Sequence, residues 1–96
     1  MNLLSVVVPV KDEQENIPLL VERLHTALDA TIAWEAVFVD DGSRDGTFAV
    51  LEEMASRDSR VKVVRLRRNF GQSAATQAGL DAARGDVIAT MDGDLQ

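Results

Sequence analysis

The sequence contains no cysteine, which excludes disulfide bonds and thiolate metal sites. Aromatic residues make up only 4% of the chain, too few for a surface that stacks on nucleobases. Lys and Arg number 10 against 16 Asp and Glu, and the net charge of −6 disfavours non-specific binding to nucleic acid or to an anionic membrane. An acidic cleft, in contrast, often recruits a divalent cation.

Several familiar segments are also missing. No run approaches the roughly 18 apolar residues that a membrane-spanning helix needs. The N-terminal stretch MNLLSVVVPVKDEQ has no basic region and its apolar run ends in acidic residues, so we do not expect a secretion signal. No G-x-G-x-x-G follows the first apolar run and no G-x-x-x-x-G-K-[ST] occurs, which disfavours a dinucleotide-binding Rossmann domain and excludes a P-loop protein.

The composition that remains is typical of one soluble globular domain. Hydrophobic residues make up 46% of the 96 residues and charged residues 27%. Short β-branched runs alternate with helical periodicity along the whole chain. The expected strands cover residues 3–10, 34–39, 60–66 and 86–91, and the expected helices cover residues 17–28, 48–55 and 74–83.

Strands that alternate with helices predict parallel pairing through right-handed crossovers. We therefore expect residues 1–96 to form one domain, an open, doubly wound, mostly parallel α/β sheet. Asp45 or Ser43 is the expected cap of the second helix. The third helix consists almost wholly of small residues, which would let it approach the sheet closely, and Gly85 is a natural stop after it.

Polar residues gather at the carboxyl ends of all four expected strands, which read PVKDEQEN, VDDGSRDGT, LRRNFGQS and MDGDLQ. Ligands of such sheets bind at this edge, where the strand order reverses, so we expect three acidic clusters and one basic cluster to meet there. Alternation along the third strand sends only part of the trio Arg65, Arg67 and Arg68 toward that site. His25 lies far from the strand ends and is expected to be a boundary residue of the first helix, not a ligand.

Each acidic cluster also has a purely structural interpretation. Asp12, Glu13 and Glu15 precede a helix, where carboxylates commonly do no more than cap it and oppose its dipole. Asp40 and Asp41 precede a turn and are harder to explain by capping. Like charges that cluster in space repel one another unless a cation or hydrogen bonds compensate.

Asp92 and Asp94 have no helix pattern after them, and their structural interpretation is a turn with Asp-Gly chemistry. Side chains two apart on an extended segment point to the same side, so both carboxylates can face one ion. Hard oxygen ligands suit Mg²⁺ or Mn²⁺, which bind through one or two carboxylates plus substrate phosphates. The pattern therefore predicts a divalent cation and a phosphate-bearing substrate.

Three segments together resemble one known family. VVVPVKDEQENI, VFVDDGSRDGT and RNFGQSAATQAGLDAARGDVIATMDGDLQ occur in the order and spacing of family 2 glycosyltransferases. The dolichyl-phosphate mannosyltransferase-like enzymes and the bacterial polyprenyl-phosphate sugar transferases are the members that the chain resembles most. The resemblance implies a nucleotide-diphospho-sugar-binding α/β fold of the GT-A type, of which this chain would form the N-terminal half.

The resemblance also implies roles for individual residues. The nucleoside would lie beside Pro9, Asp12 and Glu13, and Asp40 would contact the base or ribose. The whole nucleotide-binding set expected is Pro9, Asp12, Glu13, Asp40, Asp41 and Asp92. The cation, Mg²⁺ or Mn²⁺, would be held by Asp92, Asp94 and Gln96. The chain departs from the family at Asp12, where Asn is more usual, and at Lys11, where many members carry an aromatic residue.

The implied activity is inverting transfer of a sugar from a nucleotide-diphospho-sugar to a polyprenyl or dolichyl phosphate at the cytoplasmic face of a membrane. The cation would offset the charge that develops on the departing nucleotide diphosphate. A phosphate acceptor needs less help from a base than a hydroxyl does. Any catalytic base and the acceptor-binding residues are expected beyond Gln96, so residues 1–96 alone are expected not to catalyse transfer.

Three other interpretations remain open at this point. A phosphoacceptor receiver module has a similar architecture and an acidic Mg²⁺ site, but it needs an aspartate after the third strand, where this chain has arginines. A phosphatase that uses D-x-D usually carries it on the first strand. The chain could also fold, or associate with itself through exposed apolar surface, without binding a ligand.

Overall fold

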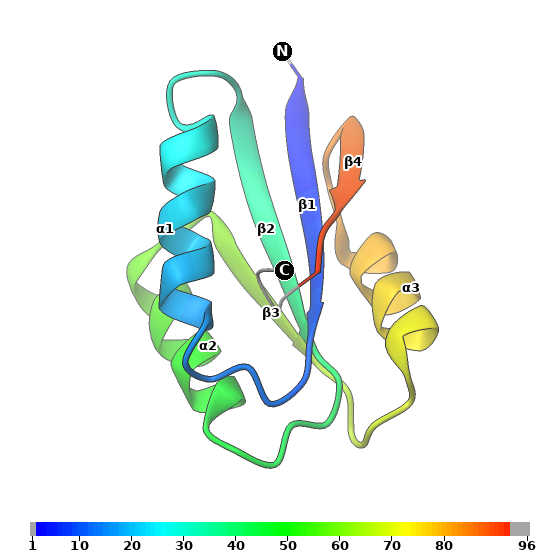
Figure 1. Ribbon diagram of the computed structural model, residues 1–96. Helices are drawn as coiled ribbons and strands as arrows, with labels where there is room; N and C mark the ends of the chain where they lie inside the picture. The colour runs from blue at the N-terminus through cyan, green and yellow to red at the C-terminus, as the bar shows by residue number, and fades with distance from the viewer. Residues whose placement is uncertain (1, 93–96) are drawn as a thin grey trace.

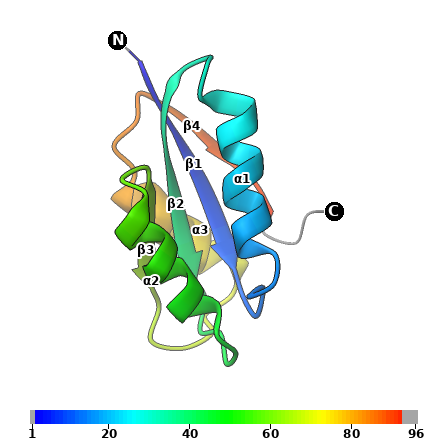
Figure 2. The same cartoon turned by 90° about the vertical axis from the view of Figure 1, so that its left-hand side faces the viewer.

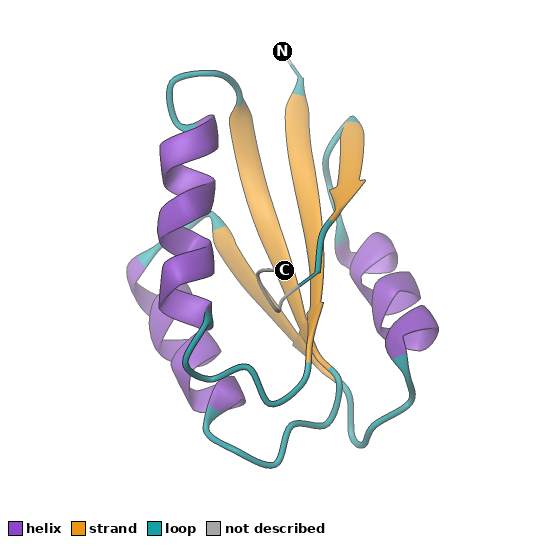
Figure 3. Cartoon of the chain, viewed as in Figure 1, coloured by secondary structure: helices purple, strands orange, loops and turns teal. Residues whose placement is uncertain are grey.

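The fold is a four-stranded parallel sheet with helices on both faces (Figure 1; Figure 3). The computed structural model describes residues 2–92. The strands are β1 (Leu3–Val10), β2 (Ala33–Asp40), β3 (Val61–Arg65) and β4 (Val87–Thr90), and the helices are α1 (Ile17–Leu28), α2 (Thr47–Arg57) and α3 (Gln72–Ala82). All neighbouring strands are parallel, in the order β3-β2-β1-β4. The predicted parallel α/β sheet is thus confirmed.

Helices α1 and α2 cover one face of the sheet and α3 covers the other (Figure 2). Side chains that alternate along β2 explain both contacts, because Trp34 and Phe38 belong to the core under α1 and α2 while Val37 and Val39 pack with Ala75 of α3. With neighbours on both edges and helices on both faces, β2 buries all of its residues except the first. The sequence of this central strand is therefore mostly apolar, and its two carboxylates, Glu35 and Asp40, are buried with the rest.

The start of α2 differs from the expectation. Its N-cap is Gly46, not Asp45 or Ser43. The Asp45 carboxylate, one residue earlier, accepts hydrogen bonds from the hydroxyl and the backbone N–H of Thr47 at 2.5 and 2.9 Å, and these bonds hold the pKa of Asp45 below its usual value. The Ser43 hydroxyl is engaged elsewhere, since it accepts the N–H of Asp12 at 2.8 Å.

The end of α3 also differs from the expectation. Its C-cap is Ala83, so Gly85 does not end the helix. A Cβ on Gly85 would lie 2.5 Å from the hydroxyl oxygen of Ser5 and 2.6 Å from the carbonyl oxygen of Leu3. Glycine is needed here because the chain passes directly against β1.

The small residues of α3 do let the helix approach the sheet closely, as predicted. A Cβ built on Gly79 would lie 2.3 Å from Cγ1 of Val7 and 3.0 Å from Cγ2 of Val39, so even one methyl group has no room. Ala75, on the same face of the helix, is fully buried against β2. The distance between α3 and the two central strands is therefore set by glycine and alanine.

We predict that Gly79→Ala destabilises the protein by about 1–3 kcal/mol, because the added methyl group overpacks the contact with Val7. Urea unfolding measures the loss as a lower midpoint at unchanged slope. Ala74→Ser also adds one heavy atom to α3, but on its exposed side, and should leave the midpoint within error. Equal midpoints for Gly79→Ala and wild type would contradict the close approach.

A buried carboxylate fixes the segment that leads into β4. Glu35 of β2 accepts hydrogen bonds from the Ser5 hydroxyl at 2.5 Å and the Arg84 N–H at 2.7 Å, and the Lys62 ammonium lies 3.6 Å from its other oxygen. Burial alone would raise the pKa of Glu35, but the hydrogen bonds from Ser5 and Arg84 outweigh it and the pKa lies below its usual value. The Ser5 hydroxyl also accepts the Gly85 N–H at 2.7 Å. The segment between α3 and β4 is therefore hydrogen-bonded to both central strands, β1 and β2.

Strand β4 forms one edge of the sheet, and all of its residues are exposed. Val87 and Ile88 point to opposite faces and are 47% and 45% exposed, because the helices pack mainly on the other three strands. Self-association stays a prediction, and these two side chains are apolar surface that it would bury.

His25 joins the ends of α1 and α2 on the side of the sheet away from the strand carboxyl ends. Its Nε2 lies 2.5 Å from the Asp58 carboxylate, its Nδ1 lies 2.9 Å from that of Asp29, and its ring packs edge-to-face on Trp34. The hydrogen bonds to Asp58 and Asp29 raise the pKa of His25 above its usual value. The prediction that His25 is a boundary residue of α1 is confirmed.

We predict that the free energy of unfolding falls as the pH rises through the neutral range. Because the folded-state pKa of His25 is raised, its stabilisation is fully present below the unfolded-state pKa of about 6.5 and is lost as the pH rises through the folded-state pKa. Urea unfolding at about pH 6 and about pH 9 measures the change. His25→Gln should show a smaller difference, and an unchanged difference would contradict the assignment.

The ionisation of Asp29 and Asp58 determines how far the stabilisation by His25 extends toward acid pH. The hydrogen bond from His25 lowers the pKa of Asp29. Burial alone would raise the pKa of Asp58, but the hydrogen bond from His25 outweighs it and this pKa is also lowered. The carboxylates therefore keep their charge, and their contribution, until the pH falls well below neutral.

Candidate functional site

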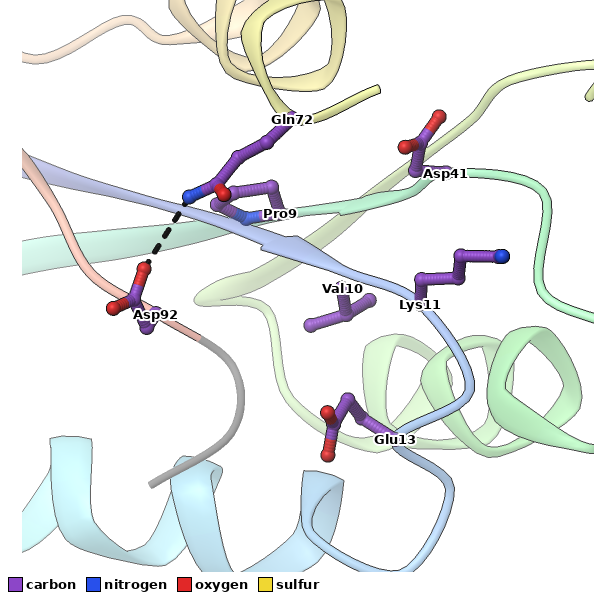
Figure 4. Close-up of a pocket in the computed structure, with 7 residues that line it drawn as sticks. All are labelled: Pro9, Val10, Lys11, Glu13, Asp41, Gln72 and Asp92. Carbon is purple, nitrogen blue, oxygen red and sulfur yellow. Dashed lines mark hydrogen bonds between the residues drawn. The ribbon is translucent and has the colours of Figure 1, made fainter. Parts of the chain in front are cut away.

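The polar strand ends meet where the strand order reverses. β1 lies between β2 and β4, so the chain runs to one side of β1 first and to the other side later, and a crevice opens beyond the carboxyl ends at such a point. A cavity of about 270 Å³ lies there (Figure 4). It is lined by Pro9, Val10, Lys11, Glu13, Asp41, Gln72 and Asp92. Four of the predicted nucleotide-binding residues are therefore brought together: Pro9, Glu13, Asp41 and Asp92.

Asp41 ties the end of β2 to the start of α3. It is 6% exposed, and its two carboxylate oxygens accept the backbone N–H groups of Phe70 and Gly71 at 2.8 and 3.0 Å. The turns on either side need glycine: Gly71 has φ of 100°, and Gly42 has φ of 73° and approaches the backbone of Asn69 so closely that a Cβ would lie 2.4 Å from its nitrogen. This hydrogen-bonded turn forms the wall between β2 and α3.

Asp12 lies outside this cavity and organises the loop between β2 and α2. Its Oδ1 accepts the N–H groups of Arg44 at 2.7 Å and of Asp45 at 3.4 Å, while its own N–H donates to the Ser43 hydroxyl. The backbone φ of Asp12 is 52°, a left-handed conformation that aspartate tolerates better than most residues. Asp12 is thus engaged by the loop, and its contact with a nucleoside stays a prediction.

Asp40 is fully buried at the end of β2 and does not line the cavity. Its Oδ1 accepts the N–H of Ser43 at 2.9 Å, whereas its Oδ2 has no hydrogen-bond partner among the described residues. A buried carboxylate oxygen without a donor is unusual and costs free energy. Its predicted contact with a base or ribose stays a prediction, which would need the loop above it to open.

Asp92 follows β4 and closes the opposite side of the cavity. Its Oδ1 accepts a hydrogen bond from the amide of Gln72, at the start of α3, at 3.3 Å (Figure 4). Asp94 and Gln96, the other predicted metal ligands, lie outside the described residues. Within residues 2–92 no group of three or more His, Asp or Glu side chains lies close enough to hold a metal ion. An exposed carboxylate beside a roomy cavity still fits a cation of the Mg²⁺ type, which needs only one or two carboxylates when a phosphate supplies further oxygens.

Lys11 and Gln72 line the cavity but were not among the predicted site residues. Lys11 comes directly after β1, and that position at a strand end was the available signal. Gln72 is the first residue of α3, which begins two residues before the predicted start. The arginines that could have supplied positive charge lie elsewhere: the Arg65 guanidinium lies 4.1 Å from the ring centroid of Phe48, and that of Arg68 lies 4.8 Å from the ring centroid of Phe70.

We predict that Asp41→Asn destabilises the start of α3. An amide offers one acceptor to two part-buried backbone N–H groups, of which that of Gly71 also bonds the Asn69 side chain at 3.1 Å, so the loss of one hydrogen bond to a charged group should cost about 1–3 kcal/mol. Urea unfolding gives the loss, and hydrogen exchange at Phe70 and Gly71 locates it. Asp81→Asn removes an exposed carboxylate from the same helix and should change neither measurement. Unchanged exchange at Phe70 in Asp41→Asn would contradict this role.

Comparison with known proteins gives one matching family. The family model Glycosyl transferase family 2 matches residues 5–96. The dodecaprenyl-phosphate galacturonate synthase of Rhizobium johnstonii is 48% identical over 95 residues, which cover 97% of this chain and 28% of that protein. The chain thus spans less than a third of the length of this relative. No helix in residues 2–92 combines the length and the apolar character that a membrane crossing requires.

Solved structures share the fold. TarS residues 1–349 of S. aureus in complex with UDP superposes with a TM-score of 0.83 at 28% identity, covering 98% of this chain and 28% of that one. The mannosyltransferase PcManGT of Pyrobaculum calidifontis in complex with GDP-Man and Mn²⁺ gives a TM-score of 0.72 at 25% identity, over 95% of this chain and 27% of that one. Both proteins were thus solved with a nucleotide, and the second also with a divalent cation.

Proposed function

The chain belongs to glycosyl transferase family 2, and we propose that it is the donor-binding part of an inverting glycosyltransferase. The donor is a nucleotide-diphospho-sugar and the acceptor is a polyprenyl or dolichyl phosphate. The fold is of the GT-A type. The single observation that carries the proposal is the cavity at the strand reversal, in which Asp92 and Asp41 lie on opposite walls at the carboxyl ends of β4 and β2.

The acceptor class rests on the relative. The protein from Rhizobium johnstonii is named for a dodecaprenyl phosphate, a long-chain lipid phosphate. Because this chain matches only 28% of that protein, the acceptor site and any catalytic base are proposed to lie outside these 96 residues. The same comparison supports a location at the cytoplasmic face of a membrane, where a nucleotide sugar and a lipid phosphate can meet.

The proposed nucleotide-binding residues are Asp12 after β1, Asp40 at the end of β2, and the four that line the cavity: Pro9, Glu13, Asp41 and Asp92. The metal ligands proposed are Asp92, Asp94 and Gln96, of which Asp92 lies in the cavity wall. When bound, a Mg²⁺ or Mn²⁺ ion supplies positive charge that offsets the charge developing on the departing nucleoside diphosphate. The chain's own part is to hold the donor against β1 and to place the Asp92 oxygens beside its phosphates.

The receiver-module alternative is not supported. A receiver would carry its phosphoacceptor aspartate after the third strand, but β3 ends at Arg65, whose side chain stacks on Phe48. The match to glycosyl transferase family 2 covers residues 5–96, which is nearly the whole chain.

We predict that the protein binds UDP or GDP, and their sugar conjugates, more tightly when Mn²⁺ is present. Isothermal titration with and without Mn²⁺ measures the difference. Asp92→Asn should weaken metal-dependent binding at least about tenfold, which corresponds to about 1.4 kcal/mol, because an amide is a poorer ligand for a hard cation. Asp94→Ala should have a similar effect.

Asp81→Asn is the control, since it removes an exposed carboxylate from α3 away from the cavity. Binding that is equally tight without a metal ion, or that Asp92→Asn leaves intact, would contradict the proposed function.

A further inference from the structure

Lys11 is the one basic residue among those that line the cavity. It lies directly after β1, the strand next to which the strand order reverses, and its side chain is exposed to solvent at the cavity. Figure 4 shows Lys11 and Asp92 at opposite ends of the set of lining residues, with the Lys11 ammonium directed away from Asp92. The cavity therefore has a carboxylate at one end and a cation at the other.

The acidic residues of the cavity already have hydrogen-bond donors. Both oxygens of Asp41 accept backbone N–H groups, Glu13 accepts the amide of Asn16 at 2.7 Å, and Asp92 accepts the amide of Gln72. The Lys11 ammonium, in contrast, forms neither an ion pair nor a hydrogen bond with any other residue of 2–92. Its three N–H groups are available to a ligand.

The cavity carries more negative than positive charge, which opposes the binding of an anionic ligand. Glu13, Asp41 and Asp92 bring three negative charges against the single positive charge of Lys11, so an anionic ligand is repelled unless cations face it. A metal ion at Asp92 compensates at one end only. An unpaired ammonium on a flexible stem, at the other end, is suited to bind phosphate or carboxylate oxygens.

We propose that Lys11 binds an anionic group of the nucleotide-sugar donor. This inference rests on the proposed function, because it takes the cavity to be the donor site. Two groups of a donor have the required chemistry: the diphosphate, which every donor carries, and the carboxylate of an acidic sugar. With either group Lys11 is a binding residue that takes no part in bond making, and with the carboxylate it also selects among sugars.

The test compares ligands that share a base and differ in charge. Wild type, Lys11→Met and Lys11→Arg are titrated with uridine, UMP, UDP, UDP-galactose and UDP-galacturonate in Mn²⁺ at low ionic strength. Lys11→Met keeps a long unbranched side chain without the charge, and Lys11→Arg keeps the charge. Arg23→Met removes a positive charge from the exposed side of α1 and controls for the net charge of the protein. Urea unfolding confirms that each variant folds.

We expect Lys11→Met to weaken the binding of at least one anionic ligand about tenfold, and Lys11→Arg to keep most of the affinity. Uridine binding should not change, and Arg23→Met should bind all ligands like wild type. A loss shared by UDP and both sugar conjugates assigns Lys11 to the diphosphate. A loss confined to UDP-galacturonate, relative to UDP-galactose, assigns it to the sugar carboxylate.

Two results would overturn the inference while the proposed function stands: wild-type affinities in Lys11→Met for all anionic ligands, or a loss for uridine as large as that for UDP. If wild type binds GDP more tightly than UDP, the guanosine series, with GDP-mannose and GDP-mannuronate as the matched sugar pair, replaces the uridine series. If wild type binds neither nucleoside diphosphate in Mn²⁺, the proposed function fails and the inference falls with it.

Discussion

The candidate site depends on one pair of hydrogen bonds, in which the Asp41 carboxylate accepts the N–H groups of Phe70 and Gly71. These bonds join the end of β2 to the start of α3 across about thirty residues of sequence, and they set where Gln72 begins the helix. Gln72 in turn reaches Asp92 beyond β4. Hydrogen bonds therefore connect the end of β2 to the start of α3, and the start of α3 to Asp92 after β4. Together they form the wall of the cavity beyond the end of β1.

The acidic residues near the carboxyl ends of the strands divide into two groups with different tasks. Asp12 and Asp45 hold the loop before α2 through backbone N–H groups, and Asp40 accepts the N–H of Ser43 beneath the same loop. Glu13, Asp41 and Asp92 line the cavity. Some of the carboxylates at the strand ends therefore hold loops in place and do not line the cavity. A ligand in the cavity meets fewer negative charges than the sequence implies.

Local patterns made most of the fold predictable, and long-range contacts account for the errors. β1 and α1 have the predicted limits, because a buried run and an amphipathic stripe are visible in the sequence itself. Ser43 does not cap α2, because its hydroxyl accepts the N–H of Asp12, more than thirty residues away. Gly85 does not end α3, because its N–H donates to Ser5 of β1 at an even greater separation in sequence. In the site, Pro9, Glu13, Asp41 and Asp92 were predicted from the strand-end rule and the family pattern. Lys11 was missed although it directly follows β1, whereas Gln72 could not be found, because only the folded turn at Gly71 brings the start of α3 over β1.

The edge position of β4 has a consequence for the order of assembly. β1 pairs with β2 at separations of about thirty residues, and the connection into β4 returns to β1 across as many as 83 residues, between Leu3 and Asp86. Closing the longer loop costs more chain entropy, so we expect β4 to join after β1 and β2 have paired. Until then β1 is itself an edge strand, with the apolar side chains of Val6 and Val7 beside unpaired backbone groups. The strand that precedes Asp92 is therefore also the one that covers the edge of β1.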